Sequence, residues 1–308
     1  MNVFHKIRGL MTPKPQALES EQFTPVRLSS SADYAQVRSS HAETFKERAA
    51  LEHQLIREDE EAFTVDGECF LCGKAAAFEV TFEYAYEVDG RLTPNWREGL
   101  RCPVCGLNNR MRAALHLLDT LCKPTSKSKI YITEQLGPIY DRLTRTFESV
   151  VGSEYLRDGT APGDVNSQGV RHEDLTRLTF GDGELDLVIS FDVLEHVPNF
   201  RAALGEIRRV LRPGGQLMLS APFRAEMSKN LTRAVLRDDG SVEHLTEPEY
   251  HGDPLSDAGC LAFYHFGWEL LDDLCATGFT APAAHLYWSR RYGYLGRDQL
   301  ILTAEVPR

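Results

Sequence analysis

The sequence lacks any hydrophobic run near the roughly 20 residues that a transmembrane helix requires. Its first ten residues, Met1–Leu10, contain neither an apolar signal core nor a small-residue cleavage site. We therefore expect a cytoplasmic protein without membrane association. Positive charge is scarce, because 34 Lys and Arg stand against 45 Asp and Glu, for a formal net charge of −11. This balance argues against a nucleic-acid partner, since such binding depends on neutralising phosphates with basic side chains.

Internal repeats and heptads are also absent, so the chain is not a solenoid or a coiled coil. Its 308 residues leave room for one domain of about 200 residues and a smaller module. The hydrophobic content of 42% is enough for a large buried core. We divide the chain into a mobile N-terminal arm (1–42), a surface helix (43–65), a four-cysteine module (66–112) and a large domain (113–308) with an insertion (223–263).

The arm and the helix differ in their patterns. The arm contains turn-forming prolines at Pro13, Pro15 and Pro25 and no sustained periodicity. In the 43–65 segment, apolar residues recur at near-helical spacing among dense charges. The sequence leaves open whether this helix lies against the large domain or forms a homodimer contact.

Paired cysteines mark the small module. Cys69 and Cys72 form one C-x-x-C pair, and Cys102 and Cys105 form the other. A glycine turn follows each pair. In a cytosolic chain this spacing predicts a tetrahedral zinc site of ribbon or treble-clef type. Four thiolates leave no open position on the ion, so the zinc is expected to be structural. The alternative is a set of unligated buried thiols.

The most informative pattern is a β-α-β unit. Leu185–Phe191 is an apolar run typical of a strand that is buried on both faces of a parallel sheet. Asn199 offers a helix N-cap, and an amphipathic helix follows it. The Arg212–Gly215 stop ends that helix, and Gln216–Ala221 is the next strand.

The segment from Leu185 to Pro222 resembles the fourth strand, fourth helix and fifth strand of class I S-adenosylmethionine-dependent methyltransferases. The features that carry the resemblance are Glu195-His196 after an acidic turn and the Arg-Pro-Gly-Gly stop. It implies an α/β fold with a Rossmann-like seven-stranded sheet, helices on both of its faces, and S-adenosyl-L-methionine as cofactor. Residues at the carboxyl ends of this and other strands of the sheet would then hold this cofactor.

The first strand of this sheet is expected at Lys129–Thr133. In the family it ends in an acid and a turn rich in glycine, which lets the backbone approach the methionine part of the cofactor. Here the acid is Glu134, but the turn keeps only one glycine, Gly137, with Pro138 beside it. This is a departure from the family pattern.

The second strand ends at Glu154. In nucleoside-binding α/β folds such a carboxylate accepts hydrogen bonds from both ribose hydroxyls; the alternative is a solvent-facing helix cap. The resemblance places Asp174 beside the adenine amino group and Leu175 next to the ring. Asp192 is expected at the carboxyl end of the fourth strand, facing the ligand crevice. Glu195 is assigned either to the floor of the active site or to a structural role.

The insertion is predicted to form the substrate wall. It contains His251, and His265 follows it; a neutral imidazole at either position would serve as general base for a hydroxyl acceptor, although a lone histidine is more often structural. The leading hypothesis is methylation of a small polar molecule, such as a sugar, a sugar nucleotide or a secondary metabolite. The alternatives are an RNA methyltransferase, with phosphate contacts from Arg97, Arg101, Arg110 and Arg112, and a non-catalytic scaffold.

Overall fold

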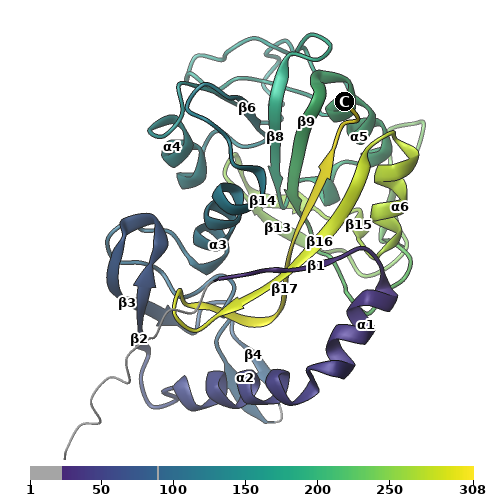
Figure 1. The fold of residues 1–308 in the computed structure, drawn as a ribbon. Coiled ribbons are helices and arrows are strands. Elements are labelled where there is room, and N and C mark those ends of the chain that lie inside the picture. The colour runs from purple at the N-terminus through teal and green to yellow at the C-terminus, as the bar shows by residue number, and fades with distance from the viewer. Residues whose placement is uncertain (1–22, 89) are drawn as a thin grey trace, which may run out of the picture.

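The computed structural model describes residues 23–88 and 90–308, and a seven-stranded sheet lies at its centre (Figure 1). From one edge to the other its strands are β1 (Val26–Leu28), β16 (Thr280–Ser289), β17 (Tyr294–Glu305), β9 (Leu211–Ser220), β8 (Leu185–Phe191), β6 (Lys129–Ile132) and β7 (Ser149–Gly152). Strands β7, β6, β8 and β9 are mutually parallel, and β17, β16 and β1 add antiparallel pairings. The predicted seven-stranded α/β sheet is confirmed.

The order of the parallel strands fixes where a ligand can bind. The chain runs from β6 outward to β7 and then returns to β8 and continues to β9 on the other side. Between β6 and β8 the direction of winding therefore reverses. In open α/β sheets, ligands bind in the crevice at the carboxyl ends of the strands at this reversal.

Helices cover both faces of the sheet, as the sequence predicted. Figure 1 shows α3 and α4 to one side of the parallel strands and α5 and α6 to the other. Along β8, Leu187 and Ile189 pack into the first of these two cores and Val188 into the second, which is why the strand is apolar throughout. The helices are α1 (Ser31–Ser40), α2 (Ala42–Leu55), α3 (Asn109–Leu117), α4 (Pro138–Thr144), α5 (Phe200–Val210) and α6 (Glu269–Ala276).

Helix α5 follows the predicted local rules. The Asn199 side chain accepts a hydrogen bond from the backbone N–H of Ala202 and caps the helix. Its buried residues are Phe200, Ala203, Leu204, Ile207 and Val210, which form one helical stripe. The helix ends at Val210, and the following strand begins at Leu211, before the Pro-Gly-Gly turn rather than after it.

The N-terminal segment differs from the expectation of a mobile arm over residues 1–42. Residues 1–22 lie outside the described part of the chain. From residue 23 onward the chain is built into the fold: β1 pairs antiparallel with β16, and Leu28 is buried in the core on the α5 face. Helix α1 follows, capped by Ser30. The expected 43–65 helix ends at Leu55, and a strand begins at Ala62.

The second difference from the expected fold lies at the edge of the sheet beyond β7. In a doubly wound sheet of Rossmann order, a third strand lies outside the second. Within residues 23–88 and 90–308, that position holds only a single parallel bridge, between Glu154 and His172. The seventh strand is supplied instead by β1 at the opposite edge.

The four-cysteine module packs directly on the large domain. Its strand pairs are β2 (Ala62–Cys69) with β3 (Lys74–Thr81), and β4 (Tyr86–Val88) with β5 (Arg91–Thr93). The alternating residues 78–88 indicate a strand pair that continues past residues 89–90. In the structure residues 78–81 belong to the first pair, Val88 pairs with Arg91 in the second, and residue 89 lies outside the described part. The core of the module includes Leu295 of β17.

Arg112 of α3 ties this module to the sheet. Its guanidinium is fully buried and donates to the carbonyl oxygens of Leu100, Tyr292 and Gly293. The same group lies 3.8 Å from the ring centroid of Phe78. Because these partners come from the module and from the β16–β17 turn, the module is held rigidly against the large domain.

The insertion forms three small antiparallel pairs between β9 and α6. Their strands are β10 (Leu231–Thr232) with β15 (Tyr264–His265), β11 (Ala234–Leu236) with β12 (Val242–His244), and β13 (Tyr250–Asp253) with β14 (Ser256–Leu261). Among the described residues, no helix has both the length and the hydropathy to cross a membrane.

The contribution of β1 to stability can be measured. Leu28 is 1% exposed, so Leu28→Ala should lower the free energy of unfolding by about 2–5 kcal/mol. Val26 in the same strand is 42% exposed, and Val26→Ala should change it by less than about 1 kcal/mol. Urea unfolding of both variants tests this; equal, small effects would show that β1 is not part of the cooperative fold.

Candidate functional site

Two acids lie at the carboxyl ends of β6 and β7, where the sequence predicted them. Glu154 Oε1 accepts hydrogen bonds from the backbone N–H groups of Gln135 (2.7 Å) and Leu136 (2.9 Å). Glu134 is half-buried, and its buried Oε1 has no hydrogen-bond partner among the described residues. The two carboxylates therefore share one loop, in which an acceptor atom is left for a ligand.

The charge state of Glu134 reflects this setting. Burial raises its pKa to about 7; Arg110 opposes the rise, and the nearby charges of Glu154 and Asp192 add to it. A carboxyl group in this state would ionise when a positive group binds beside it.

The single glycine of this loop has a steric reason. At Gly137 an added Cβ would lie 2.6 Å from Glu134 Oε1, so any other residue would displace the acid. Gly137 is also the N-cap of α4, and Pro138 is the first residue of that helix, a position that favours proline. The unusual Gly-Pro sequence therefore starts a helix and leaves the approach to Glu134 open.

The residues expected around the adenine lie further along the chain. Asp174 Oδ1 accepts from the backbone N–H and the hydroxyl of Thr176, which shapes the turn after residue 172. Leu175 is buried in the core on the α5 face. The parallel bridge at His172 places this turn beside Glu154.

Asp192 lies at the end of β8 with a left-handed backbone (φ 52°), a conformation that non-glycine residues rarely adopt. Arg97 Nη2 donates to both of its oxygens, at 2.9 and 2.7 Å, and Arg110 Nη1 is 3.1 Å from Oδ2. Although burial alone would raise it, these two guanidinium groups hold the pKa of Asp192 below its usual range. Asp192 is therefore an anchor for arginines as well as a wall of the crevice.

Sequence reasoning did not predict this ion-pair network. Glu98 completes it by pairing with Arg97 and with Arg110, at 3.1 Å for the latter. The arginines come from the four-cysteine module and the start of α3, so this module forms part of the crevice. The only sequence signal was the clustering of arginines around the second cysteine pair.

The two candidate bases lie in one acidic cluster. Glu249 Oε1 is 3.1 Å from Nε2 of His251 and 3.1 Å from Nε2 of His265. The carboxylate of Glu195 lies on the other side of His251, and together with Glu249 it raises the pKa of His251 to about 9. These two carboxylates favour the protonated form of His251 when no ligand is bound, so a role as general base stays a prediction for His251 and His265.

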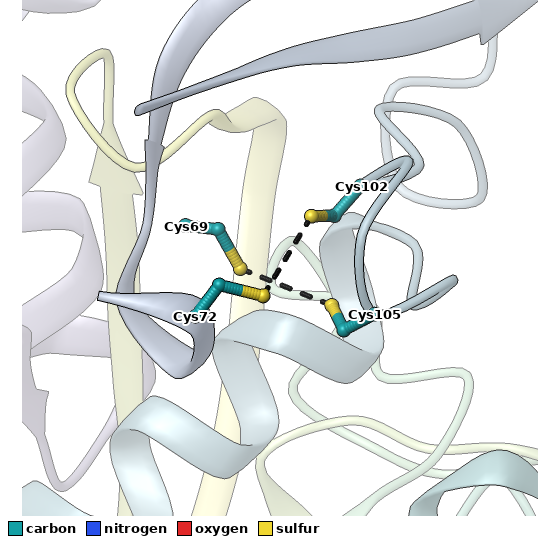
Figure 2. Close-up of side chains that lie close together, drawn as sticks. All are labelled: Cys69, Cys72, Cys102 and Cys105. Atoms are coloured by element: carbon teal, nitrogen blue, oxygen red, sulfur yellow. Dashed lines mark hydrogen bonds between the residues drawn. The ribbon is translucent and has the colours of Figure 1, made fainter. Parts of the chain in front are cut away.

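The four cysteines converge at one point. The sulfur atoms of Cys69 and Cys105 are 3.9 Å apart, and those of Cys72 and Cys102 are 4.0 Å apart; all four lie within 4.8 Å of one another (Figure 2). An ion with four Zn–S bonds of about 2.3 Å in a tetrahedron separates its sulfurs by about 3.8 Å. The arrangement therefore fits a zinc ion.

Comparisons with known proteins find matches in the large domain. The family described as "Methyltransferase domain" matches residues 137–219, which run from the glycine of the Glu134 loop to the end of β9. A "Probable S-adenosylmethionine-dependent methyltransferase" of Mycolicibacterium smegmatis is 39% identical over 59 residues, 19% of this chain and 23% of that protein. A demethylmenaquinone methyltransferase of Listeria welshimeri is 30% identical over 111 residues, 35% of this chain and 45% of that protein.

The chain thus covers less than half of the length of these curated relatives. Among solved structures, an S-adenosylmethionine-dependent methyltransferase of Mesorhizobium loti is similar over 65% of this chain and 99% of that chain, with 16% identity and a TM-score of 0.41. At this TM-score the superposition adds nothing to the strand order. Residues 137–219 thus match the methyltransferase-domain family, and this stretch includes strands β7, β8 and most of β9.

Proposed function

We propose that this protein is a class I S-adenosylmethionine-dependent methyltransferase that acts on a small polar acceptor, such as a sugar, a sugar nucleotide or a secondary metabolite. The observation that carries the proposal is the pair of acids, Glu134 and Glu154, at the ends of two adjacent parallel strands. Glu154 lies inside the matched family region, and Glu134 lies three residues before it. When bound, S-adenosyl-L-methionine supplies a methyl group that its positive sulfur already activates. The chain then has to hold the cofactor and the acceptor, orient them toward each other and shield them from water.

Each part of the cofactor has a candidate partner. Glu154 would accept the ribose hydroxyls through the oxygen that the loop amides leave available, and Asp174 would face the adenine amino group, with Leu175 nearby. The unpartnered oxygen of Glu134 would accept from the positively charged methionine part, next to Gly137. Asp192, held by Arg97 and Arg110, would close the crevice on the acceptor side.

The choice of a small acceptor over RNA rests on the arginines. Arg97 and Arg110 are engaged with Asp192, and Arg112 is buried against carbonyl oxygens. Arg101 donates to the carbonyl oxygen of Gly106. These four side chains were the proposed phosphate contacts, and each already has a partner within the protein. The demethylmenaquinone methyltransferase also supports a small-molecule acceptor. So does an O-methyltransferase of Penicillium expansum, which is 35% identical over 111 residues, 34% of this chain and 37% of that protein.

We also propose that Cys69, Cys72, Cys102 and Cys105 hold one structural zinc ion. The ion would close the β2–β3 module, whose small core is too limited to be stable alone. Of the two arginines that contact Asp192, Arg97 lies just before the second cysteine pair and Arg110 just after it. The zinc would therefore hold the acceptor side of the crevice in place.

The zinc site predicts a metal content of about one zinc per chain, measured by mass spectrometry of the metal. Cys102→Ser should lose the zinc and destabilise the module. Cys275→Ser changes an exposed cysteine outside the cluster and should keep it. Full zinc retention after all four cysteines are replaced would contradict the assignment.

The cofactor site predicts that Glu154→Ala lowers the affinity for S-adenosyl-L-methionine at least about tenfold, because hydrogen bonds to a charged group contribute roughly 1.5–3 kcal/mol each. Glu154→Gln keeps an oxygen for the amides of Gln135 and Leu136, so it should retain the loop and still bind more weakly. Glu148→Ala, an exposed acid before β7, is the control. Calorimetry that gives one dissociation constant for all four proteins would place the ribose elsewhere.

The raised pKa of Glu134 predicts a pH dependence. The fold disfavours its ionised form, so the stability due to this group falls as the pH rises from about 4.3, the unfolded value, to about 7. A positively charged ligand favours the ionised form, so cofactor affinity should increase with pH, by at most about tenfold per unit below pH 7. Titrations at pH 6 and pH 8 should differ for the wild type and agree for Glu134→Gln. Equal wild-type affinities would exclude Glu134 from cofactor binding.

A further inference from the structure

A second group of potential metal ligands lies beside the crevice. Glu195 and His196 belong to the one-turn helix η3 (Leu194–His196) directly after β8, and His251 belongs to β13 of the insertion. One ligand atom from each residue lies within 4.8 Å of the other two. We propose that Glu195, His196 and His251 bind a divalent first-row metal cation, of the Mn²⁺ or Fe²⁺ type, that holds the methyl acceptor.

Glu195 gives the first argument. Its side chain is 0% exposed, and neither carboxylate oxygen accepts a hydrogen bond from the described residues. A buried carboxylate without hydrogen bonds is strongly destabilising unless a cation neutralises it. The nearest groups are His251 Nδ1 at 3.3 Å and His196 Nε2 at 3.6 Å, which lie on the same oxygen, Oε1. All three atoms therefore point to one place.

The histidines are oriented as metal-binding histidines usually are. His196 Nδ1 lies 2.8 Å from the carbonyl oxygen of Leu261, which can only accept, so Nδ1 carries the proton and Nε2 offers its lone pair toward Glu195. His251 Nε2 lies 3.1 Å from Glu249 Oε1 and would donate to it, which leaves Nδ1 for the ion. A carboxylate or carbonyl behind each ligating imidazole is the usual second shell of a metal site.

Glu249 is itself held in place. Its Oε1 also contacts His265 Nε2 at 3.1 Å, and its Oε2 lies 3.2 Å from Arg233 Nη2. His265 is thus a positioning residue for Glu249 and does not face the proposed ion through this nitrogen. The two histidines that the sequence placed as rival bases then have different tasks in one assembly.

The distances suit an ion. Bonds of about 2.1 Å place neighbouring ligand atoms about 3.0 Å apart in an octahedron and about 3.4 Å apart in a tetrahedron. The distances of 3.3 and 3.6 Å from Glu195 Oε1 are near these values. Two imidazoles and one carboxylate leave coordination positions open, and this set is typical of non-haem iron sites. His196 and His251 are 12% and 29% exposed, so the open side faces the solvent.

The position of this site gives it a role in methyl transfer, a step that rests on the proposed function. Helix η3 directly follows the carboxyl end of β8, at the sheet edge where Glu134 and Glu154 also lie, and the charge of Asp253 in β13 adds to the raised pKa of Glu154. The cation would bind an acceptor hydroxyl and lower its pKa, and the proton would pass to water. The oxygen then forms a bond to the methyl carbon as the carbon–sulfur bond breaks, and that electron pair remains on sulfur.

The competing arrangement is an ion pair without metal, in which a doubly protonated His251 bridges Glu195 and Glu249. It leaves Glu195 Oε2 and the lone pair of His196 without partners. The two arrangements differ in one measurable property, the binding of a cation.

The test is a titration of the full-length protein with Mn²⁺, in which electron paramagnetic resonance measures free Mn²⁺. The cysteine cluster does not interfere, because thiolates favour softer ions. The wild type should bind one Mn²⁺. Glu195→Gln and His251→Asn should each weaken binding at least about tenfold, and Glu249→Gln, which removes an orienting group, by about 10–100-fold. His244→Ala, an exposed histidine of the same insertion, should bind as the wild type does.

Circular dichroism of each variant shows whether it folds, and Glu195→Gln replaces the buried charge by a group of the same shape. The proposal would be overturned if the wild type bound no Mn²⁺. It would also be overturned if Glu195→Gln and His251→Asn bound Mn²⁺ as tightly as the wild type does. Calorimetry of the wild type with S-adenosyl-L-methionine separates the two ideas. Mn²⁺ binding without cofactor binding would support the metal site and contradict the methyltransferase role. Cofactor binding without Mn²⁺ binding would support the methyltransferase role and contradict the metal site.

Discussion

The ion pair between Asp192 and the two arginines, Arg97 and Arg110, connects the two parts of this protein. It joins the end of β8 to the cysteine module at the place where the winding of the sheet reverses. Removal of either side would leave a half-buried charge without its partner and would loosen this contact. The module is therefore better described as a part of the fold at the carboxyl edge of the sheet than as an appendage. A change in its fold would alter the crevice directly.

Much of the fold follows from local sequence rules. The β8–α5–β9 unit was predictable because its strand is apolar on both faces and its helix has a clear stripe and an Asn199 cap. The cysteine spacing predicted a cluster because two short turns can face only one ion. The short strand β1 was missed, since its three residues have no periodicity of their own and depend on pairing with β16.

The site was predictable only in part. Glu134, Glu154 and Asp192 were placed from their positions at strand ends, which sheet topology fixes. Their partners were not, because a hydrogen bond such as the one from His196 to Leu261 joins residues that only the folded insertion brings together. For the same reason, no local pattern indicated that Glu195, well separated in sequence from His251, would lie 3.3 Å from it.

The pairing of β1 with β16 also affects how the chain folds. Strand β1 is synthesised early, whereas β16 and its neighbour β17 come near the end of the sequence. Contacts between such distant segments require a large loss of chain entropy before they form, and they slow folding. During translation, the nascent chain would hold its early hydrophobic residues, including Leu28, exposed until the last strands emerge. We expect that chaperones that bind nascent chains would recognise this segment during that interval.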